Sequence, residues 1–203
     1  KKMWIILFCL VLISVIFLSY RFYPPFGGRS PKDAWSQSKN FRGRIFVNQI
    51  HTPMDMRGHD MIHLMRDMVR RDGERKPDKK ISPEQLDVQT MLASKKPQVA
   101  WLGHSTTLIR INGKTIMTDP IFSKRASPFP FAGPRRLVSK LSLTVEDLPA
   151  IDAVVISHDH YDHLDYATIR KLRHKTKRFF VPLGVAAHLR TWRATACSRA
   201  RRS

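Results

Sequence analysis

The hydrophobic pattern begins with an apolar run near the start of the chain. Residues 3–20, MWIILFCLVLISVIFLSY, carry no charged side chain. A helix of that length just crosses a hydrocarbon core of about 30 Å, and Trp4, Tyr20 and Tyr23 suit the membrane interfaces. A cleaved signal peptide shares the basic start and apolar core, but no small-residue cleavage site follows. We predict a single-pass anchor over residues 1–23, in a bacterial inner membrane. Basic residues flank both ends, so the sidedness stays open.

A linker and two helices are predicted over residues 24–97. Proline and glycine punctuate residues 24–30, as is typical of a linker. Residues 60–71 carry an apolar stripe with helical spacing. It consists of Met61, Leu64, Met65 and Met68. We predict that this helix packs on the core, and the alternative is a helix lying on anionic lipid. The sequence SPEQ that opens residues 82–94 is typical of a helix start with a capping box.

Short apolar, β-branched runs with turn signals between them follow, and they indicate strands. Strands are predicted over residues 98–102, 107–111, 114–118, 151–156 and 178–182, helices over residues 165–173 and 185–192, and proline-rich coil over residues 121–136. The dipeptide Asn112-Gly113 predicts a tight hairpin. The later order of strand, loop, helix and strand implies a parallel crossover. Together these elements predict an α/β (α+β) fold, with a mixed sheet covered by helices.

The most informative stretch is the loop after the strand at residues 151–156. Its sequence HDHYDH places three histidines and two aspartates at residues 158–163. Imidazoles two positions apart can converge on one ion, so His158 and His160 are predicted to bind a first metal. The adjacent Asp162 and His163 can turn to a second metal. These ligands suit Zn²⁺, with Mn²⁺ or Fe²⁺ as alternatives. The alternative is a solvated polar loop, which is disfavoured because the segment directly follows an apolar strand of the kind found in a buried sheet.

Other residues are weaker candidates for the same site. Asp119 and Asp165 are each predicted to orient a ligand imidazole through a hydrogen bond. The alternatives are a turn residue for Asp119 and a helix N-cap for Asp165. For His104, a structural polar contact is favoured over metal ligation. Four basic residues around the proline-rich loop are candidates for binding a substrate phosphate, with solvated surface charge as the alternative. They are Lys124, Arg125, Arg135 and Arg136.

Composition adds a strong positive charge. Thirty-six Lys and Arg against 16 Asp and Glu give a formal net charge of +20. Such a charge favours anionic partners, but the basic residues are dispersed and no nucleic-acid-binding motif accompanies them. We therefore predict a phospholipid or other anionic phosphodiester as partner, together with a membrane and without specific nucleic acid. The two cysteines supply neither a disulfide framework nor a thiolate metal site.

Three segments together resemble the metallo-β-lactamase superfamily, and within it the N-acylphosphatidylethanolamine-hydrolysing phospholipase D-like proteins. They are WLGHSTTLIRINGKTIMTDPIFSKRASPFPFAGPRR, DLPAIDAVVISHDHYDHLDY and RFFVPLGVAAHL. The resemblance implies an αββα sandwich with two zinc ions per complete site and a possible homodimer. It also implies phosphodiester hydrolysis of a phospholipid by a hydroxide that bridges the metals, with Asp162 and His163 as catalytic residues.

The resemblance covers the first half of that domain, over residues 98–192. Members of the family bring a third His, a bridging Asp and a further His from downstream segments. Residues 193–203 are a basic tail without His, Asp or Glu, for which truncation or a frameshift is the expected cause. Two alternatives therefore stay open. One is a metallo-hydrolase acting on a lactone, a sugar phosphate or a nucleic-acid diester, and the other is an inactive truncated membrane protein.

Overall fold

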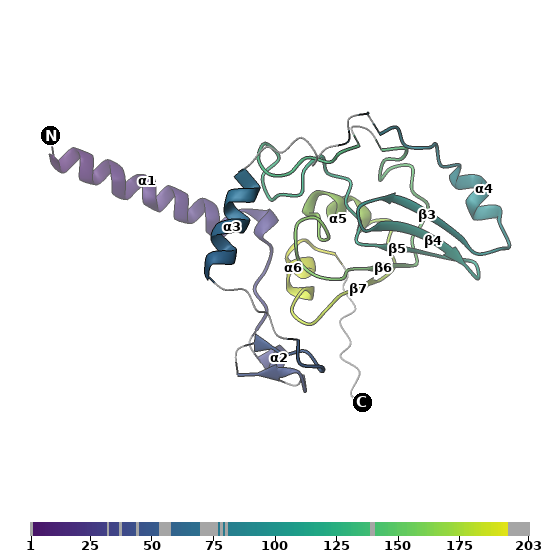
Figure 1. The fold of residues 1–203 in the computed structure, drawn as a ribbon, viewed down its shortest axis with the longest axis horizontal. Helices are drawn as coiled ribbons and strands as arrows, with labels where there is room; N and C mark the ends of the chain where they lie inside the picture. The colour runs from purple at the N-terminus through teal and green to yellow at the C-terminus, as the bar shows by residue number, and fades with distance from the viewer. Residues whose placement is uncertain are drawn as a thin grey trace.

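A five-stranded mixed sheet forms the centre of the molecule in the computed structural model (Figure 1), which describes residues 2–31, 33–36, 38–43, 45–52, 58–69, 77, 79, 81–138 and 141–194. The strands are β3 (Gln98–Gly103), β4 (Thr106–Ile111), β5 (Lys114–Thr118), β6 (Ala153–Val155) and β7 (Phe179–Phe180), and they lie in this order. The first three pair antiparallel, and β5–β6 and β6–β7 pair parallel. The predicted mixed α/β sheet is confirmed.

The strand register sorts the side chains into two faces. One row runs across the sheet through paired positions on all five strands, namely Ala100, Leu108, Met117, Val154 and Phe179. The last four of these are fully buried and belong to the hydrophobic core. The next row, on the opposite face, consists of Trp101, Thr107, Thr118, Val155 and Phe180. Its large apolar members are exposed.

Three helices contribute side chains to the core on the buried face. They are α4 (Val88–Ala93), α5 (Tyr166–Leu172) and α6 (Ala186–Thr191), and they supply Met91, Ile169, Leu172 and Leu189. The crossover from β6 through α5 to β7 gives the parallel pairing that the sequence predicts. The hairpin between β4 and β5 turns at Asn112 and Gly113, whose φ angles are 47° and 71°. Positive φ at both central residues is the requirement of a type I′ turn.

The predicted start of the helix over residues 82–94 is wrong. Residues 81–87 are not helical, and α4 begins at Val88 rather than near Ser82. The Asp87 carboxylate accepts hydrogen bonds from the backbone N–H groups of Gln89 (3.0 Å) and Thr90 (3.1 Å). A carboxylate at this position satisfies two free N–H groups and interacts favourably with the helix dipole. Asp87 is therefore the cap.

The N-terminal region is arranged around one long helix. The helix α1 (Lys2–Phe22) projects away from the rest of the protein (Figure 1), buries no residue, and is long and apolar enough to cross a membrane. A short 3-10 helix, η1 (Pro24–Phe26), follows. Beyond it lie α2 (Asp33–Ser36) and a small hairpin of β1 (Phe41–Arg42) and β2 (Ile45–Phe46).

The proline- and glycine-rich segment after α1 packs on the sheet domain instead of forming a free linker. The Trp192 indole N–H donates to the Pro24 carbonyl (2.7 Å), and the Tyr23 hydroxyl donates to the Pro128 carbonyl (2.8 Å). A Cβ atom at Gly27 would lie 2.0 Å from Nδ1 of His188. The glycine thus allows the backbone to approach α6 closely.

The predicted packing of the amphipathic helix on the core is also wrong. This helix is α3 (Gly58–Val69). Its apolar side chains at Met61, Ile62, Leu64 and Met65 are exposed. Among the described residues of α3, Asp60 alone is half-buried. The apolar stripe is present, but no described element covers it.

Candidate metal centre

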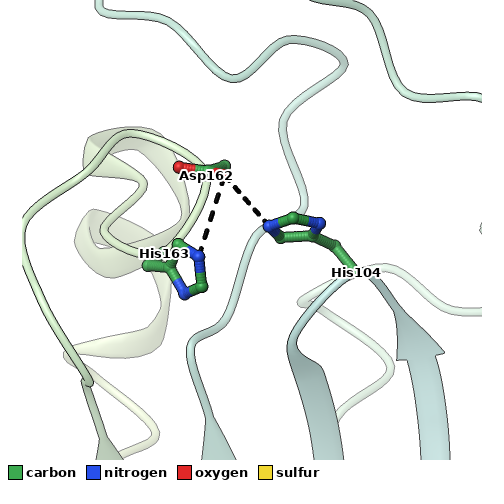
Figure 2. A group of neighbouring side chains, drawn as sticks. All are labelled: His104, Asp162 and His163. Atoms are coloured by element: carbon green, nitrogen blue, oxygen red, sulfur yellow. Dashed lines mark ion pairs between the residues drawn. The ribbon is translucent and has the colours of Figure 1, made fainter. Parts of the chain in front are cut away.

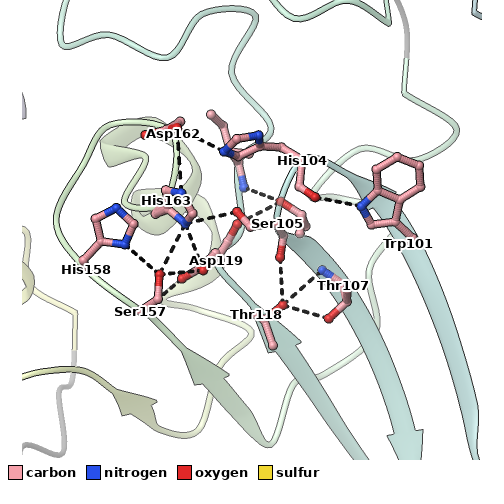
Figure 3. Close-up of polar contacts among 12 residues, drawn as sticks. Trp101, His104, Ser105, Thr107, Thr118, Asp119, Ser157, His158, Asp162 and His163 are labelled. Carbon is pink, nitrogen blue, oxygen red and sulfur yellow. Dashed lines mark hydrogen bonds and ion pairs between the residues drawn. The ribbon is translucent and has the colours of Figure 1, made fainter. Parts of the chain in front are cut away.

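The candidate site lies at one edge of the sheet, where three segments meet (Figure 3). The first is the turn at His104 between β3 and β4. The second is Asp119, directly after β5. The third is the loop after β6, which begins at Ser157 and carries the HDHYDH sequence. Parallel pairing of β5 with β6 places the carboxyl ends of these two strands side by side. Side chains distant in the sequence therefore converge there.

Asp119 is the buried acceptor at the base of the site. Its carboxylate accepts hydrogen bonds from the backbone N–H and the hydroxyl of Ser157, both at 2.7 Å. It also lies 3.0 Å from Nδ1 of His163. The φ angle of Asp119 is +36°, a region that non-glycine residues rarely adopt and that costs about 1–3 kcal/mol. Its carbonyl accepts a hydrogen bond from the buried Thr106 hydroxyl (2.8 Å), which holds this backbone in place.

The contact with Asp119 defines which nitrogen of His163 is available to a ligand. A carboxylate accepts a proton donor, so Nδ1 carries the hydrogen in this arrangement. The opposite nitrogen, Nε2, then presents its lone pair and lies 3.7 Å from an Asp162 oxygen. A carboxylate that orients a histidine in this way is the usual support of a metal-binding imidazole. Asp119 thus contacts a predicted ligand, and its role as an orienting residue stays a prediction.

Three side chains bring their donor atoms together above that base (Figure 2). Nε2 of His104 lies 3.0 Å from an oxygen of Asp162. The available donor atoms of His104, Asp162 and His163 all lie within 4.8 Å of one another. His104 itself has a φ angle of +48°. Its carbonyl accepts a hydrogen bond from the Trp101 indole (2.8 Å), which holds the turn in this strained conformation.

Charge at the site favours an ionised carboxylate. Burial acts to raise the pKa of Asp162, but its own backbone N–H, His163 and His104 together outweigh it, so the pKa lies below its ordinary value. An ionised carboxylate with two imidazoles is a donor set for a divalent transition metal. The residues present therefore fit a metal ion. They do not distinguish zinc from iron or manganese.

The other two predicted ligands lie beside this group. The ring centroids of His158 and His163 are 4.0 Å apart, and those of His158 and His160 are 4.6 Å apart. Nδ1 of His158 lies 2.9 Å from the hydroxyl of Ser157. The loop thus gathers all three imidazoles at one edge. The tightest donor group, however, combines two predicted ligands with His104, for which the sequence favoured a structural contact.

Asp165 does not orient an imidazole. Its carboxylate accepts hydrogen bonds from the backbone N–H of Ala167 (3.1 Å), at the start of α5, and from the hydroxyl and backbone N–H of Ser123 (2.8 and 2.9 Å). Among the described residues, none of its hydrogen bonds goes to a histidine. The N-cap alternative is correct, and the same carboxylate also ties the proline-rich loop to α5.

Two of the four phosphate-binding candidates have structural contacts. The Arg136 guanidinium donates to the carbonyls of Ile121 (2.9 Å) and Ser123 (2.7 Å). Burial lowers its pKa, although Asp165 opposes the effect. The Arg125 guanidinium donates to the Gly133 carbonyl within the loop. Lys124 and Arg135 are exposed, and they stay candidates for contact with an anion.

A cleft of about 430 Å³ lies beside the candidate metal centre, and Asp162 belongs to both. Its lining includes Phe26 from the segment after α1, Asp159 and His160 from the loop, and His188 and Trp192 at α6. His188 lies 3.8 Å from Asp159, and burial lowers its pKa despite this carboxylate. No spacing in the sequence selects His188, because its position depends on the packing of α6 against the loop.

Comparisons with known proteins show what parts of this chain are similar to. Residues 114–201 match the beta-lactamase superfamily domain. Uncharacterized protein Rv0906 of Mycobacterium tuberculosis is 41% identical over 158 residues, which are 77% of this chain and 42% of that protein. N-acyl-phosphatidylethanolamine-hydrolyzing phospholipase D 1 of Caenorhabditis elegans is 44% identical over 87 residues, which are 42% of this chain and 24% of that protein. The chain thus spans about two fifths of the first relative and a quarter of the second.

Among solved structures, the diiron β-hydroxylase CmlA from Streptomyces venezuelae aligns with a TM-score of 0.38 and 26% identity, over 52% of this chain and 21% of that chain. The sequence matches carry the comparison. Over residues 114–201, this chain is similar to the beta-lactamase superfamily domain, and one further similar protein is a metal-dependent hydrolase of Saccharolobus solfataricus, 33% identical over 94 residues.

Proposed function

We propose that the protein is a membrane-anchored, zinc-dependent phosphodiesterase that hydrolyses a phospholipid. The observation that carries the proposal is the donor group of His104, Asp162 and His163 on a base formed by Asp119. The similarity to N-acylphosphatidylethanolamine-hydrolysing phospholipases supports a phosphodiester as substrate. The apolar helix α1 supports a substrate that resides in the membrane.

The residues of the site have separate roles in this proposal. His104, Asp162 and His163 would hold one metal ion. His158 and His160, whose ring centroids are 4.6 Å apart, are the candidates to bind a second ion. Asp119 holds the proton at Nδ1 of His163 and so keeps Nε2 directed toward Asp162. When bound, the metal supplies Lewis-acid stabilisation of charge on a phosphoryl oxygen and activates water.

The cleft beside the metal centre suits an amphiphilic substrate. Phe26, Leu164 and Trp192 form apolar parts of its wall, whereas Asp159, His160 and His188 form polar parts. An apolar wall accepts part of a lipid chain and excludes water from the polar groups near the metal. Of the two exposed candidates, Lys124 and Arg135, Lys124 lies closer in the sequence to Ala126, which also lines the cleft, and we expect it to attract a phosphate there.

Hydrolysis by the full chain tests this proposal directly. Zinc-loaded protein would be assayed against N-acylphosphatidylethanolamine in mixed micelles and against bis(4-nitrophenyl) phosphate in solution. We expect turnover of the lipid, and its loss in His163→Ala and in Asp162→Asn. The matched control is His174→Ala, because His174 is exposed and contacts Arg173 rather than the site.

The outcomes separate the possible functions. Faster hydrolysis of the soluble diester than of the lipid would overturn the phospholipid as substrate. Bound zinc without turnover of either compound would overturn the phosphodiesterase. Equal activity of His163→Ala and the unaltered protein would exclude this cluster as the source of the reaction.

A further inference from the structure

We propose that the loop containing Phe129 and Phe131 inserts into the headgroup region of the same bilayer that α1 enters. The inference rests on the membrane anchor of the proposed function. The aromatic surface consists of Tyr23, Phe26, Phe129 and Phe131. It would make the domain lie on the membrane with its cleft at the lipid surface, rather than extend from a flexible tether.

Ring contacts join this surface to the end of α1. Tyr23 stacks on Phe129 with centroids 5.4 Å apart and an interplanar angle of 17°. Phe26 lies edge-on to Phe129 at 5.9 Å and contacts Tyr20, in the last turn of α1, at 4.8 Å. The series continues to Phe131, whose centroid is 5.7 Å from that of Phe129. A helix that enters the bilayer therefore leads directly to the loop.

The loop presents its apolar tip to solvent on a fixed backbone. Phe131 is 78% exposed, although a Phe side chain gains a large free energy from leaving water. The two arms of the loop are joined by hydrogen bonds from Ala126 N–H to the Pro134 carbonyl (3.1 Å) and from Arg136 N–H to the Lys124 carbonyl (3.0 Å). Because the backbone is already ordered, burial of the tip in lipid requires little further loss of conformational entropy.

Charge around the surface selects an anionic bilayer over another apolar partner. Arg21 and Arg29 flank the end of α1, and Lys124 and Arg135 flank the loop; all four are exposed. Exposed aromatic rings bordered by basic side chains are typical of surfaces that bind the interface of anionic membranes. Phe26, which belongs to the aromatic surface, and Ala126, in the same loop as Phe129 and Phe131, both line the cleft, so the cleft adjoins this surface.

Depth-dependent quenching in vesicles tests the insertion. The full chain with Cys9→Ser and Cys197→Ser would carry Phe131→Cys labelled with the fluorophore NBD, in vesicles of phosphatidylglycerol and phosphatidylcholine. We expect a blue shift of the emission and strong quenching by a lipid with a nitroxide in its headgroup region. The matched control is Lys114→Cys, because the Lys114 side chain is 65% exposed and lies at the start of β5, beside the hairpin turn. Its label should show neither change.

A third labelled protein separates this inference from the anchor. It keeps Cys9, within α1, as its sole cysteine. A label at residue 9 that is quenched by deep nitroxides, with no quenching at residue 131, would overturn the insertion and leave the anchor intact. No quenching at either position would overturn the anchor. A blue shift at residue 131 that rises with protein concentration in detergent without phospholipid would show that a second copy covers the loop, which also overturns the inference.

Discussion

The two faces of the central sheet differ although the same strands form both. On one face, Val154 and Phe179 are fully buried beneath the helices. On the other face, their direct neighbours Val155 and Phe180 are exposed, and so is Trp101 on β3. Strand geometry makes consecutive residues point in opposite directions. Because the residue types on the two faces match, the difference in exposure shows that the helices cover one face and leave the other open.

The covered face is the one that supports the candidate site. The core on this face includes Leu164, in the loop after β6, and Ile169 and Leu172 in α5. Asp165 connects this helix to the proline-rich loop. The uncovered face holds an apolar row that a soluble domain rarely leaves open. Local folding of the site and burial of the whole sheet are thus separate properties, and the variants below test them separately.

The largest effect is expected from two neighbouring phenylalanines on β7. Phe179→Ala should lower the free energy of unfolding by about 3–5 kcal/mol, since it leaves a cavity in the core. Phe180→Ala should lower it by less than about 1 kcal/mol, because its side chain is already 43% exposed and surface changes have small effects. Urea unfolding in detergent measures both, with Phe179→Leu as a milder variant should Phe179→Ala fail to fold. Equal losses would contradict the assignment of the two faces.

The second prediction compares the two ends of the central strands. Asp119→Asn should weaken metal affinity about 10–100-fold, because Asn lacks the negative charge and one of the two acceptor oxygens that hold Ser157 and His163. Asp152→Asn should leave the affinity unchanged, since Asp152 contacts Thr115, Lys114 and Lys177 rather than a histidine. Titration with zinc against a competing chelator measures the two constants. An unchanged affinity in Asp119→Asn would refute its orienting role.

The third prediction concerns the corrected role of Asp165. Asp165→Asn should lower the free energy of unfolding by about 1–2 kcal/mol, because it weakens the cap of α5 and the contacts to Ser123. Metal affinity should change little. A loss of metal binding with normal stability would contradict the capping role and would indicate that Asp165 orients a metal ligand.

The smallest effect should come from Asp152 and should depend on pH. The side-chain hydrogen bond from Lys177 is the main cause that lowers the pKa of Asp152, followed by the backbone N–H of Thr115. A lowered pKa in the folded state stabilises the protein above the unfolded value of about 3.9, and this contribution is lost as the pH falls through the folded value. At pH 7, Asp152→Asn should cost on the order of 0.5 kcal/mol.

The free energies of unfolding of Asp152→Asn and the unaltered protein, measured again at pH 3, test the pH dependence. The difference between Asp152→Asn and the unaltered protein should shrink at that pH, because protonation removes the ion pair from the unaltered protein. A difference that grows on acidification would have the wrong sign for a lowered pKa.

Features with local causes could be predicted from the sequence. The Asn112-Gly113 turn, the strands beside it and the ligand-rich loop after β6 each depend on neighbouring residues. The sequence did not reveal the donor position of His104, because that position depends on the pairing of β3 with β4 and on a strained φ angle at the turn. The start of α4 was misplaced because two adjacent segments both contain capping residues, and only the fold decides between them. The prediction that α3 is buried was wrong, because an apolar stripe in the sequence does not reveal which element covers it.

The metal content of matched histidine variants shows whether His104 and His163 bind a metal ion. Purified full chain without a histidine tag would be dialysed against zinc and measured by elemental analysis, beside His104→Ala, His163→Ala and the control His174→Ala. We expect bound zinc in the unaltered protein and in the control, with a loss in both other variants. No zinc in the unaltered protein, or full retention in His104→Ala and His163→Ala, would contradict the metal centre.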